Sequence, residues 1–531
     1  MSDAKSAIDS FLDYKADTTM QCGNYSIDIP KLKDGEQYRF HFDMTACVGC
    51  HCCEVACNEQ NNNPADTKWR RVGEMETGEF PDTLQLFNSM SCNHCIDPEC
   101  LKGCPTNSYI KLDNGVVYHV DEDCIGCQYC TWNCPYEVPT FNKDRGIVTK
   151  CHMCNDKLEL GQTPACVQAC PAGAIMIEVV NKDKWIKNDM AKEGVAPHLP
   201  DISITKPTTR YTLPDVPKDQ EIKPADEHIL KPAHSELPLV FMTVLTQMSV
   251  GGFVALFLGE VLNLFGLNSI DINFWYFLAV LIPAGVGLPL SALHLGRPGL
   301  AITAMKNIKT SWLSREALAL GAYAGGVTLL VIASLLGLPT FIKFLLSIGV
   351  VALGVYGIYA QSMIYRIKAR PSWDRKSTTL RFLGAGYLGF LLVGFVLALN
   401  SQMQNLLAIL APTLMIALYQ MHLIYEEMVF YKYLDKEHPL YYQLSRTKKL
   451  LEENFGTLKK VRLYSLGIFA IAIPLLVIVF ASSNFDGFAT FLLFVSLFGS
   501  IASELLGRYL FYVTVVPLGL AGNFFAGNQR G

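Results

Sequence analysis

The second half of the chain is dominated by long apolar segments separated by short polar ones. From about residue 238 onward, eight such segments recur, and each reaches the roughly 20 residues that a helix needs to cross a bilayer. They cover residues 239–263, 272–293, 316–337, 340–364, 380–399, 405–430, 463–482 and 487–513. A soluble bundle would need more polar surface than these short connections supply. The pattern therefore predicts an all-α bundle of eight transmembrane helices.

Lys and Arg are distributed unevenly among the connections. The segments "GLNSID", "GLPTFIK", "SQMQN" and "SSNFDG", which follow the first, third, fifth and seventh helices, contain a single lysine in total. The connections on the other side are rich in Lys and Arg, as in "YRIKARPSWDRK" and "LKKVR". Basic loops stay on the cytoplasmic side, so we expect the basic side, the N-terminal domain and both termini to be cytoplasmic in a prokaryotic cell membrane.

Composition differs sharply between the two halves. Only 17% of the 531 residues are charged, against about 25% in a typical soluble protein. All 18 cysteines precede residue 171, whereas the net charge of −4 gives no reason to expect nucleic acid as a partner. We expect an N-terminal extension (1–37), a cysteine-rich domain (38–180), an extended linker rich in proline and charge (181–236), the membrane domain (237–520) and a C-terminal tail (521–531).

Sixteen of the cysteines form four groups. The first reads "CVGCHCCEVAC", with its ligand candidates spaced C-x2-C-x2-C-x3-C, and the third repeats that spacing. Groups two to four each end in Cys-Pro. The groups are Cys47, Cys50, Cys53 and Cys57; Cys92, Cys95, Cys100 and Cys104; Cys124, Cys127, Cys130 and Cys134; and Cys151, Cys154, Cys166 and Cys170.

This spacing is typical of iron–sulfur ligation. Three thiolates on one loop hold three corners of a cubane, while the fourth is directed elsewhere and ligates another cluster in two-cluster ferredoxins. Sixteen ligands suffice for four [4Fe-4S] clusters. Zinc sites also use C-x2-C pairs, but not this triplet followed by C-x3-C-P, and disulfides are disfavoured because we expect no export leader. Cys22 and Cys52 remain as ordinary thiols. His51, His94 and His152 lie beside cysteines, and we expect supporting or surface roles for them.

The cysteine domain resembles the iron–sulfur subunit of the dimethyl sulfoxide reductase family of molybdopterin oxidoreductases. The resemblance is carried by the four groups, by "NEQNNNPADTKWRRVGE" and by "CIGCQYCTWNCPYEVP", and it extends to polysulfide reductases and cytoplasmic sulfite dehydrogenases. It implies a double ferredoxin-like α+β fold in which ligands cross between groups. The implied sets are Cys47, Cys50, Cys53 and Cys170 (set 1); Cys57, Cys151, Cys154 and Cys166 (set 2); Cys92, Cys95, Cys100 and Cys134 (set 3); and Cys104, Cys124, Cys127 and Cys130 (set 4).

Titratable residues in or near the apolar segments are candidates for function. Glu504 and Arg508 are four residues apart on one helical face, so they could neutralise each other. His294 ends the second segment on the basic side. It could be an interfacial side chain, but a quinol head group needs a hydrogen-bond partner and a proton acceptor there, and imidazole suits both roles.

The membrane domain resembles the anchor subunit of dimethyl sulfoxide reductases. The resemblance rests on "ELPLVFMTVLTQMSVGGF", "HLGRP", "SWLSREAL", "YRIKARPSW" and "ELLGRYLFY". It implies a haem-free, eight-helix anchor that reacts with menaquinone or another quinone, with His294 as the quinone-site histidine. The remaining candidates for this site, by motif or position, are Gln247, Arg297, Tyr365, Glu504 and Arg508.

Together these features predict an electron-transfer and anchor subunit that has no substrate chemistry of its own beyond quinone exchange. The resemblance implies a large catalytic partner with a molybdenum bis-pterin cofactor. Two alternatives are a redox-driven ion-translocating membrane protein, for which few acidic residues are available, and a self-sufficient ferredoxin–quinone reductase.

Overall fold

The computed structural model describes residues 19–22, 25–28, 32–217, 220–225, 227–267, 269–482 and 485–519. The predicted C-terminal tail lies outside the described residues, as does most of the N-terminal extension. The chain divides into two compact units. Unit 1 comprises Met1–Leu230 together with Pro517–Gly531, and unit 2 comprises Lys231–Val516. Each unit is described below by itself.

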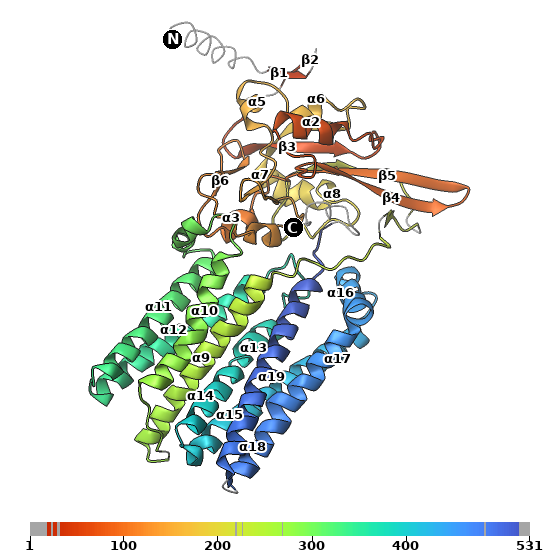
Figure 1. Cartoon of the computed structure of the whole chain (residues 1–531). Helices are drawn as coiled ribbons and strands as arrows, with labels where there is room; N and C mark the ends of the chain where they lie inside the picture. The colour runs from red at the N-terminus through yellow and green to blue at the C-terminus, as the bar shows by residue number, and fades with distance from the viewer. Residues whose placement is uncertain are drawn as a thin grey trace, which may run out of the picture. The chain divides into compact units, whose positions relative to one another are not determined.

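Unit 1 is a mixed α/β, ferredoxin-like unit built from small sheets and short helices (Figure 1). Its central strand β3 (Glu36–Asp43) pairs antiparallel with β10 (Ile175–Asn181) and parallel with β11 (Arg210–Thr212). The long hairpin of β4 (Arg71–Glu79) and β5 (Asp82–Met90) carries β12 (Lys223–Pro224) on its edge. The remaining strands form two-stranded ladders: β1 (Thr19–Cys22) with β2 (Tyr25–Asp28), β6 (Tyr109–Lys111) with β7 (Val117–His119), and β8 (Thr140–Asn142) with β9 (Ile147–Thr149).

Short helices in unit 1 coincide with the cysteine groups. They are α2 (Cys52–Gln60), α3 (Glu99–Gly103), α4 (Tyr129–Asn133), α5 (Asn155–Glu159) and α6 (Ala165–Gln168). Cys104 and Cys134 are the C-caps of α3 and α4, and both have extended backbone angles. Each is followed by proline, which disfavours the helical conformation in the residue before it. The Cys-Pro pair therefore ends the helix and turns the last cysteine of the group away from it.

The predicted linker is more structured than its composition suggested. Residues 181–236 contain α7 (Lys182–Lys184), the π-helical turn η1 (Trp185–Asp189) and α8 (Met190–Glu193), in addition to β11 and β12. Trp185 in this stretch is buried, at 1% exposure. Edge strands gain their hydrogen bonds from a distant partner, which local composition does not reveal.

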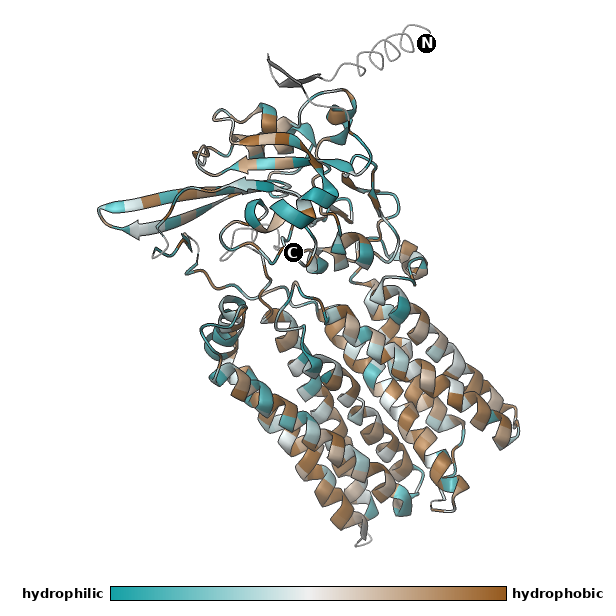
Figure 2. Ribbon diagram, turned by 180° about the vertical axis from the view of Figure 1, so that it is seen from behind, coloured by the Kyte–Doolittle hydropathy of each residue, from teal (hydrophilic) through white to brown (hydrophobic). Residues whose placement is uncertain are grey.

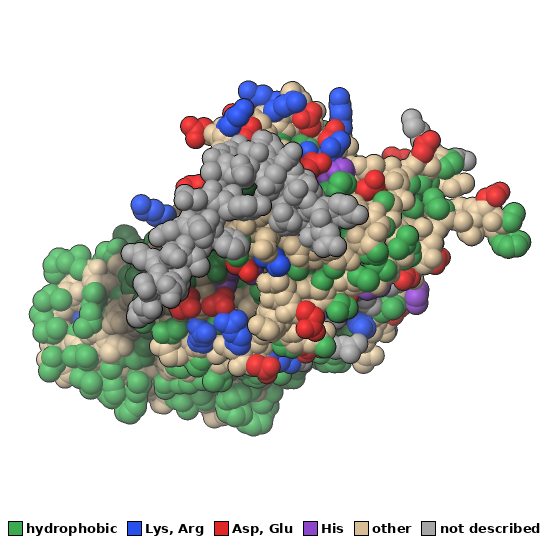
Figure 3. Space-filling model, turned by 90° about the horizontal axis from the view of Figure 1, so that it is seen from above, with side chains coloured by type: hydrophobic (Ala, Val, Ile, Leu, Met, Phe, Trp, Pro, Cys, Tyr) green, Lys and Arg blue, Asp and Glu red, His purple; other side chains and the backbone are tan. Residues whose placement is uncertain are grey.

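Unit 2 is a bundle containing eight helices, among its described residues, that are long and apolar enough to cross a membrane. Its helical ribbons are hydrophobic over most of their length (Figure 2). Figure 3 shows broad areas of hydrophobic side chains with few Lys, Arg, Asp or Glu among them. The spans are α9 (Leu237–Leu264), α10 (Phe274–Ala292), α11 (Trp312–Leu335), α12 (Thr340–Tyr365), α13 with α14 (Lys376–Gly384 and Tyr387–Leu399), η3 with α15 (Met403–Asn405 and Leu406–Lys432), α17 to α18 (Gly456–Ser465, η5 Leu466–Ala472 and Ile473–Ser482) and α19 (Asp486–Val513).

The connections carry three shorter helical elements. These are the 3-10 helix η2 (Pro298–Met305), the helix α16 (Tyr441–Lys449) and the π-helical turn η4 (Leu450–Asn454). All eight predicted spans are present, but three begin at least four residues earlier than the apolar pattern indicated, at Trp312, Lys376 and Gly456. Each of these helices opens with charged or polar residues, which a search for apolar runs leaves out.

Helix α9 is the most buried of the eight described spans, since 78% of an 18-residue apolar stretch within it is buried. It approaches α14 closely through facing glycines. A Cβ at Gly389 would lie 1.8 Å from the backbone nitrogen of Gly252, and one at Gly251 would lie 2.0 Å from the carbonyl oxygen of Gly386. Small residues are enriched at helix contacts in membranes because they allow this backbone proximity.

We expect Gly389→Ala to destabilise the bundle by about 1–3 kcal/mol, because the new methyl group would meet backbone atoms that cannot move aside cheaply. Thermal unfolding of the purified protein in detergent measures the effect. Gly349→Ala in α12 is the matched control, since a Cβ there meets nothing within 4 Å. Equal melting temperatures for the two variants would contradict the close α9–α14 contact.

Candidate functional site

The fold brings together the members of set 1 from distant positions in the sequence. Cys47, Cys50, Cys53 and Cys170 line one pocket, although Cys170 is more than a hundred residues away from the others. Cys53 lies in the first turn of α2, and its Sγ is 3.4 Å from the Ser89 Oγ on β5. The loop between these cysteines includes Gly49 at φ 66°, where a Cβ would lie 2.3 Å from the Phe87 ring. Glycine is therefore required for this loop to pack against β5.

The other three sets are also brought together. Cys92, Cys95, Cys100 and Cys134 of set 3 line a second pocket. In set 2, Cys57 interacts electrostatically with Cys151, Cys154 and Cys166. In set 4, Cys130 interacts in the same way with Cys104, Cys124 and Cys127.

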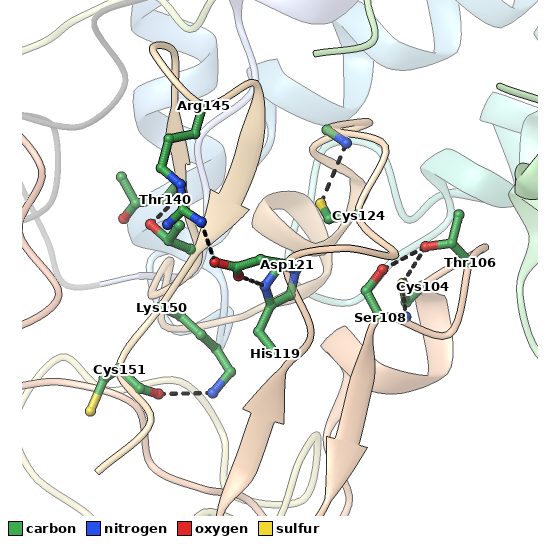
Figure 4. A network of polar contacts seen from close by, with 12 residues as sticks. Cys104, Thr106, Ser108, His119, Asp121, Cys124, Thr140, Arg145, Lys150 and Cys151 are labelled. Carbon is green, nitrogen blue, oxygen red and sulfur yellow. Dashed lines mark hydrogen bonds and ion pairs between the residues drawn. The ribbon is translucent and has the colours of Figure 1, made fainter. Parts of the chain in front are cut away.

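The chemistry of these thiols fits iron–sulfur clusters. Burial raises the pKa of Cys127, Cys134 and Cys154 to about 12, so a cationic centre is needed to hold them as thiolates. Among the described residues, no three Cys, His, Asp or Glu side chains are close enough to hold a single metal ion. The sulfurs also accept hydrogen bonds from backbone N–H groups, at 3.4 Å from Gly126 to Cys124 and 3.3 Å from Ser108 to Cys104 (Figure 4). Such bonds tune cluster potentials.

Lys150 is a buried cation between two of the sets. It is 2% exposed, and its Nζ lies 3.6 Å from the Sγ of Cys92 in set 3 and 2.8 Å from the carbonyl oxygen of Cys151 in set 2. Figure 4 shows the side chain reaching that carbonyl. The amine also donates to the carbonyl of Val117.

Arg70 occupies a comparable position between sets 1 and 2. It is also 2% exposed and donates to Ser91 Oγ at 2.8 Å and to Ser89 Oγ at 3.1 Å. Its charge interacts with Cys53 of set 1 and with Cys166 of set 2. Sequence reasoning did not single out Arg70 or Lys150, because a basic residue near a cysteine gives no sign of whether it points inward.

The remaining cysteines and histidines take supporting positions. Cys52 is exposed, and the side chain of Cys22 lies outside the described residues. His94 is buried and accepts a hydrogen bond from the Val117 N–H at its Nδ1, while its Nε2 is 3.9 Å from the Sγ of Cys151. His51 pairs with Glu54 at 3.3 Å, and His152 accepts from the Asn155 N–H.

In unit 2, His294 is held by a glutamate. Its Nδ1 lies 2.9 Å from Glu236, which precedes α9, and the two side chains are only 8% and 11% exposed. His234 lies 3.4 Å from the same carboxylate. Although burial raises the pKa of Glu236, hydrogen bonds from both histidines outweigh it and lower the pKa to about 2. Glu236 is therefore ionised at neutral pH. No periodic pattern in the sequence indicated that Glu236 contacts His294.

Four helices share a buried polar network. Gln361 on α12 donates to Glu316 on α11 at 2.9 Å and accepts from Gln247 on α9 at 2.8 Å. Gln247 in turn accepts from the Arg508 Nη2 on α19 at 2.9 Å. We call Glu316, Gln361, Gln247 and Arg508 the polar network.

Tyr365 lies close to the polar network and to the pair formed by His294 and Glu236. Its hydroxyl is 2.5 Å from that of Tyr512, and the residue interacts electrostatically with Glu316, Arg508 and Glu236. Of the predicted quinone-site residues, the structure thus brings together His294 (through Glu236), Gln247, Tyr365 and Arg508. Glu316 and Gln361 join them through their hydrogen bonds.

The other two predicted residues take different positions. Arg297 directly precedes η2, three residues after His294. Glu504 lines a separate pocket that also borders Arg508. Within the described part of unit 2, Glu504 and Arg508 form no ion pair, since Arg508 donates to Gln247 instead.

Comparison with known proteins agrees with this two-part organisation. A family model described as the DMSO reductase anchor subunit (DmsC) matches residues 231–514, and one described as a 4Fe-4S dicluster domain matches residues 83–180. One of the chains of the anaerobic dimethyl sulfoxide reductase of Escherichia coli is 38% identical over 180 residues, which make up 32% of this protein and 86% of the relative. One of the subunits of the sulfite dehydrogenase of Allochromatium vinosum is 34% identical over 192 residues, or 32% of this protein and 80% of the relative.

Proposed function

This chain is a member of the family of DMSO reductase anchor subunits (DmsC) and carries an iron–sulfur electron-transfer domain ahead of the anchor, and we propose that it relays electrons between a membrane quinone and a separate catalytic subunit. One observation carries the proposal. A single polypeptide combines sixteen cysteines gathered in four sets with a membrane bundle that contains both a buried polar network and the His294–Glu236 pair.

Each cysteine set holds one [4Fe-4S] cluster in this proposal. The clusters, when bound, carry single electrons, and the protein's own residues set where they sit and how readily they are reduced. Lys150 and Arg70 place positive charge between successive sets, which favours the reduced state of the neighbouring clusters.

The quinone site is formed by His294 and the polar network. Glu236 holds the imidazole of His294 in one orientation, ready to take a proton from the quinol hydroxyl. Because its pKa is lowered from 4.5 to about 2, Glu236 stabilises the folded state above pH 4.5, and this contribution is lost as the pH falls toward 2. The orientation of His294 therefore persists across physiological pH. Glu316, Gln361 and Tyr365 supply the further hydrogen-bonding groups that a quinone head group requires.

The partner is proposed to be a large molybdenum bis-pterin subunit, and the quinone to be menaquinone or a related molecule. Two of the relatives are components of a dimethyl sulfoxide reductase and of a sulfite dehydrogenase, and their names support a partner of that class. The basic connections support a cytoplasmic location for unit 1.

We expect His294→Leu to lower quinol oxidation by at least about 100-fold, because the proton acceptor is lost. Glu236→Gln should also lower quinol oxidation, since the imidazole ring of His294 is no longer held in one orientation. Quinol-dependent reduction of the clusters, followed by absorbance, measures the effect, and dithionite-reduced cluster spectra should be unchanged. The control is His422→Leu, an exposed histidine of α15 whose loss should leave turnover intact. Normal turnover in His294→Leu would refute the site.

We expect Cys127→Ser to remove or convert the cluster of set 4, because that set loses one of its four ligands. Bound iron should fall by up to about a quarter, the share of one cluster among four. Iron analysis and electron paramagnetic resonance of the reduced protein provide the measurement. Cys52→Ser, at an exposed thiol outside the sets, is the control. An unchanged spectrum and iron content in Cys127→Ser would contradict the assignment.

We expect Lys150→Met to lower the potentials of the clusters in sets 2 and 3 by on the order of 100 mV, the effect of one charge about 7 Å away at an effective dielectric constant of about 20. Redox titration monitored by electron paramagnetic resonance resolves the individual clusters. The clusters of sets 1 and 4 serve as internal references. A uniform shift of all signals, or none, would rule out a local role for Lys150.

A further inference from the structure

One pocket in unit 2 is lined by basic side chains from several spans. Arg381 of α13, Arg462 of α17 and Arg508 of α19 border it, together with the carboxylates of Glu427 on α15 and Glu504 on α19. We call it the arginine pocket. Apolar side chains complete its wall, among them Ile424, Met428 and Leu451.

Positive charge exceeds negative charge in this pocket. Lys459 adds a fourth cation, against the two carboxylates. Arg381 forms an ion pair with the Glu427 carboxylate at 2.5 Å. No described carboxylate lies within ion-pair distance of the guanidinium of Arg462, which instead lies over Gly507, where a Cβ would be 2.3 Å from its Nε.

Arg508 borders the pocket and has an unused donor, while its guanidinium lies 3.7 Å from the centroid of the Phe382 ring. The residue is 5% exposed, and its Nη2 is engaged by Gln247, but its Nε has no hydrogen-bond partner among the described residues. A buried cation whose charge is not fully compensated costs free energy, so an anion bound in the pocket would lower that cost.

The charged residues lie at a common depth. Arg381 is five residues from the start of α13, Arg462 six from the start of α17, and Arg508 five from the end of α19. At about 1.5 Å per residue, each is roughly 8 Å inside the helix end. These ends belong to the basic side of the bundle. Where a helix end lies at the membrane surface, this depth is that of the boundary between lipid head groups and acyl chains, where the abundant anions are lipid phosphates.

We propose that the arginine pocket binds the phosphate group of an anionic phospholipid. Guanidinium groups pair with phosphate through two parallel hydrogen bonds. A quinone carbonyl is neutral and would leave the excess charge in place. Because Arg508 also donates to Gln247, the bound phosphate holds one end of the polar network in position.

Native mass spectrometry of the full-length protein tests this. The protein is released from nanodiscs that contain equal amounts of phosphatidylglycerol and phosphatidylcholine. We expect the wild-type protein to retain one phosphatidylglycerol in preference to phosphatidylcholine, and Arg462→Gln to retain at least tenfold less. The control is Lys436→Gln, which removes the same charge from an exposed position in the connection after α15, and it should retain the lipid like wild type. Arg462→Lys should retain an amount between those of wild type and Arg462→Gln, because it keeps the charge but loses the two parallel hydrogen bonds.

Three results would overturn the proposal. The first is equal retention of the two lipids, or equal loss in Arg462→Gln and Lys436→Gln. The second is displacement of the lipid by millimolar inorganic phosphate, which would make free phosphate the ligand. The third is loss of co-purified quinone, rather than lipid, in Arg462→Gln. Should Arg462→Gln fail to accumulate, Leu451→Glu places a carboxylate on the pocket wall and should also abolish retention.

Discussion

Charge that is buried away from water has to be compensated where it lies, and both units of this protein are arranged around that requirement. In unit 1, buried cysteine sulfurs lie close to the cations of Lys150 and Arg70. In unit 2, Arg381 lies against Glu427, and His294 against Glu236. Each compensating group comes from a different element of the fold. The chemistry is therefore possible only once the tertiary structure has formed.

The two units meet this requirement with different side chains because their tasks differ. A cluster site exchanges electrons without protons, so its surroundings need fixed charges that do not titrate, and the ammonium and guanidinium groups of Lys150 and Arg70 meet that need. A quinone exchanges electrons together with protons, so its site needs a group that changes charge readily. Histidine is the side chain suited to this, and in the proposed function the ionised Glu236 keeps the ring of His294 in place during the exchange.

The sequence predicted the large features because they follow from local rules. The hydrocarbon thickness of a bilayer imposes the length of an apolar run, so all eight spans were recognisable. The beginnings of helices such as α11 were not, because the first turn of that helix contains Ser314 and Arg315, which a search for apolar runs leaves out. The cysteine groups were clear from spacing, whereas their crossing into sets came from a resemblance. Lys150, Arg70 and Glu236 were missed altogether, since inward orientation is a property of the fold.

The composition of the polar network bears on where protons travel. Gln361 and Gln247 are amides, which donate and accept hydrogen bonds but do not ionise, so they fix the positions of Glu316 and Arg508 without carrying a net proton between them. Glu260, the next acidic residue along α9, is 24 residues beyond Glu236, or about 36 Å along the helix. A proton taken up at His294 has its nearest acidic neighbour in Glu236, on the same side of the bundle. In the proposed reaction, protons therefore leave on the side from which the electrons depart, and quinol oxidation moves no net charge across the membrane. This separates the relay from a redox-driven ion pump, which would need titratable groups spaced through the full depth of the bundle.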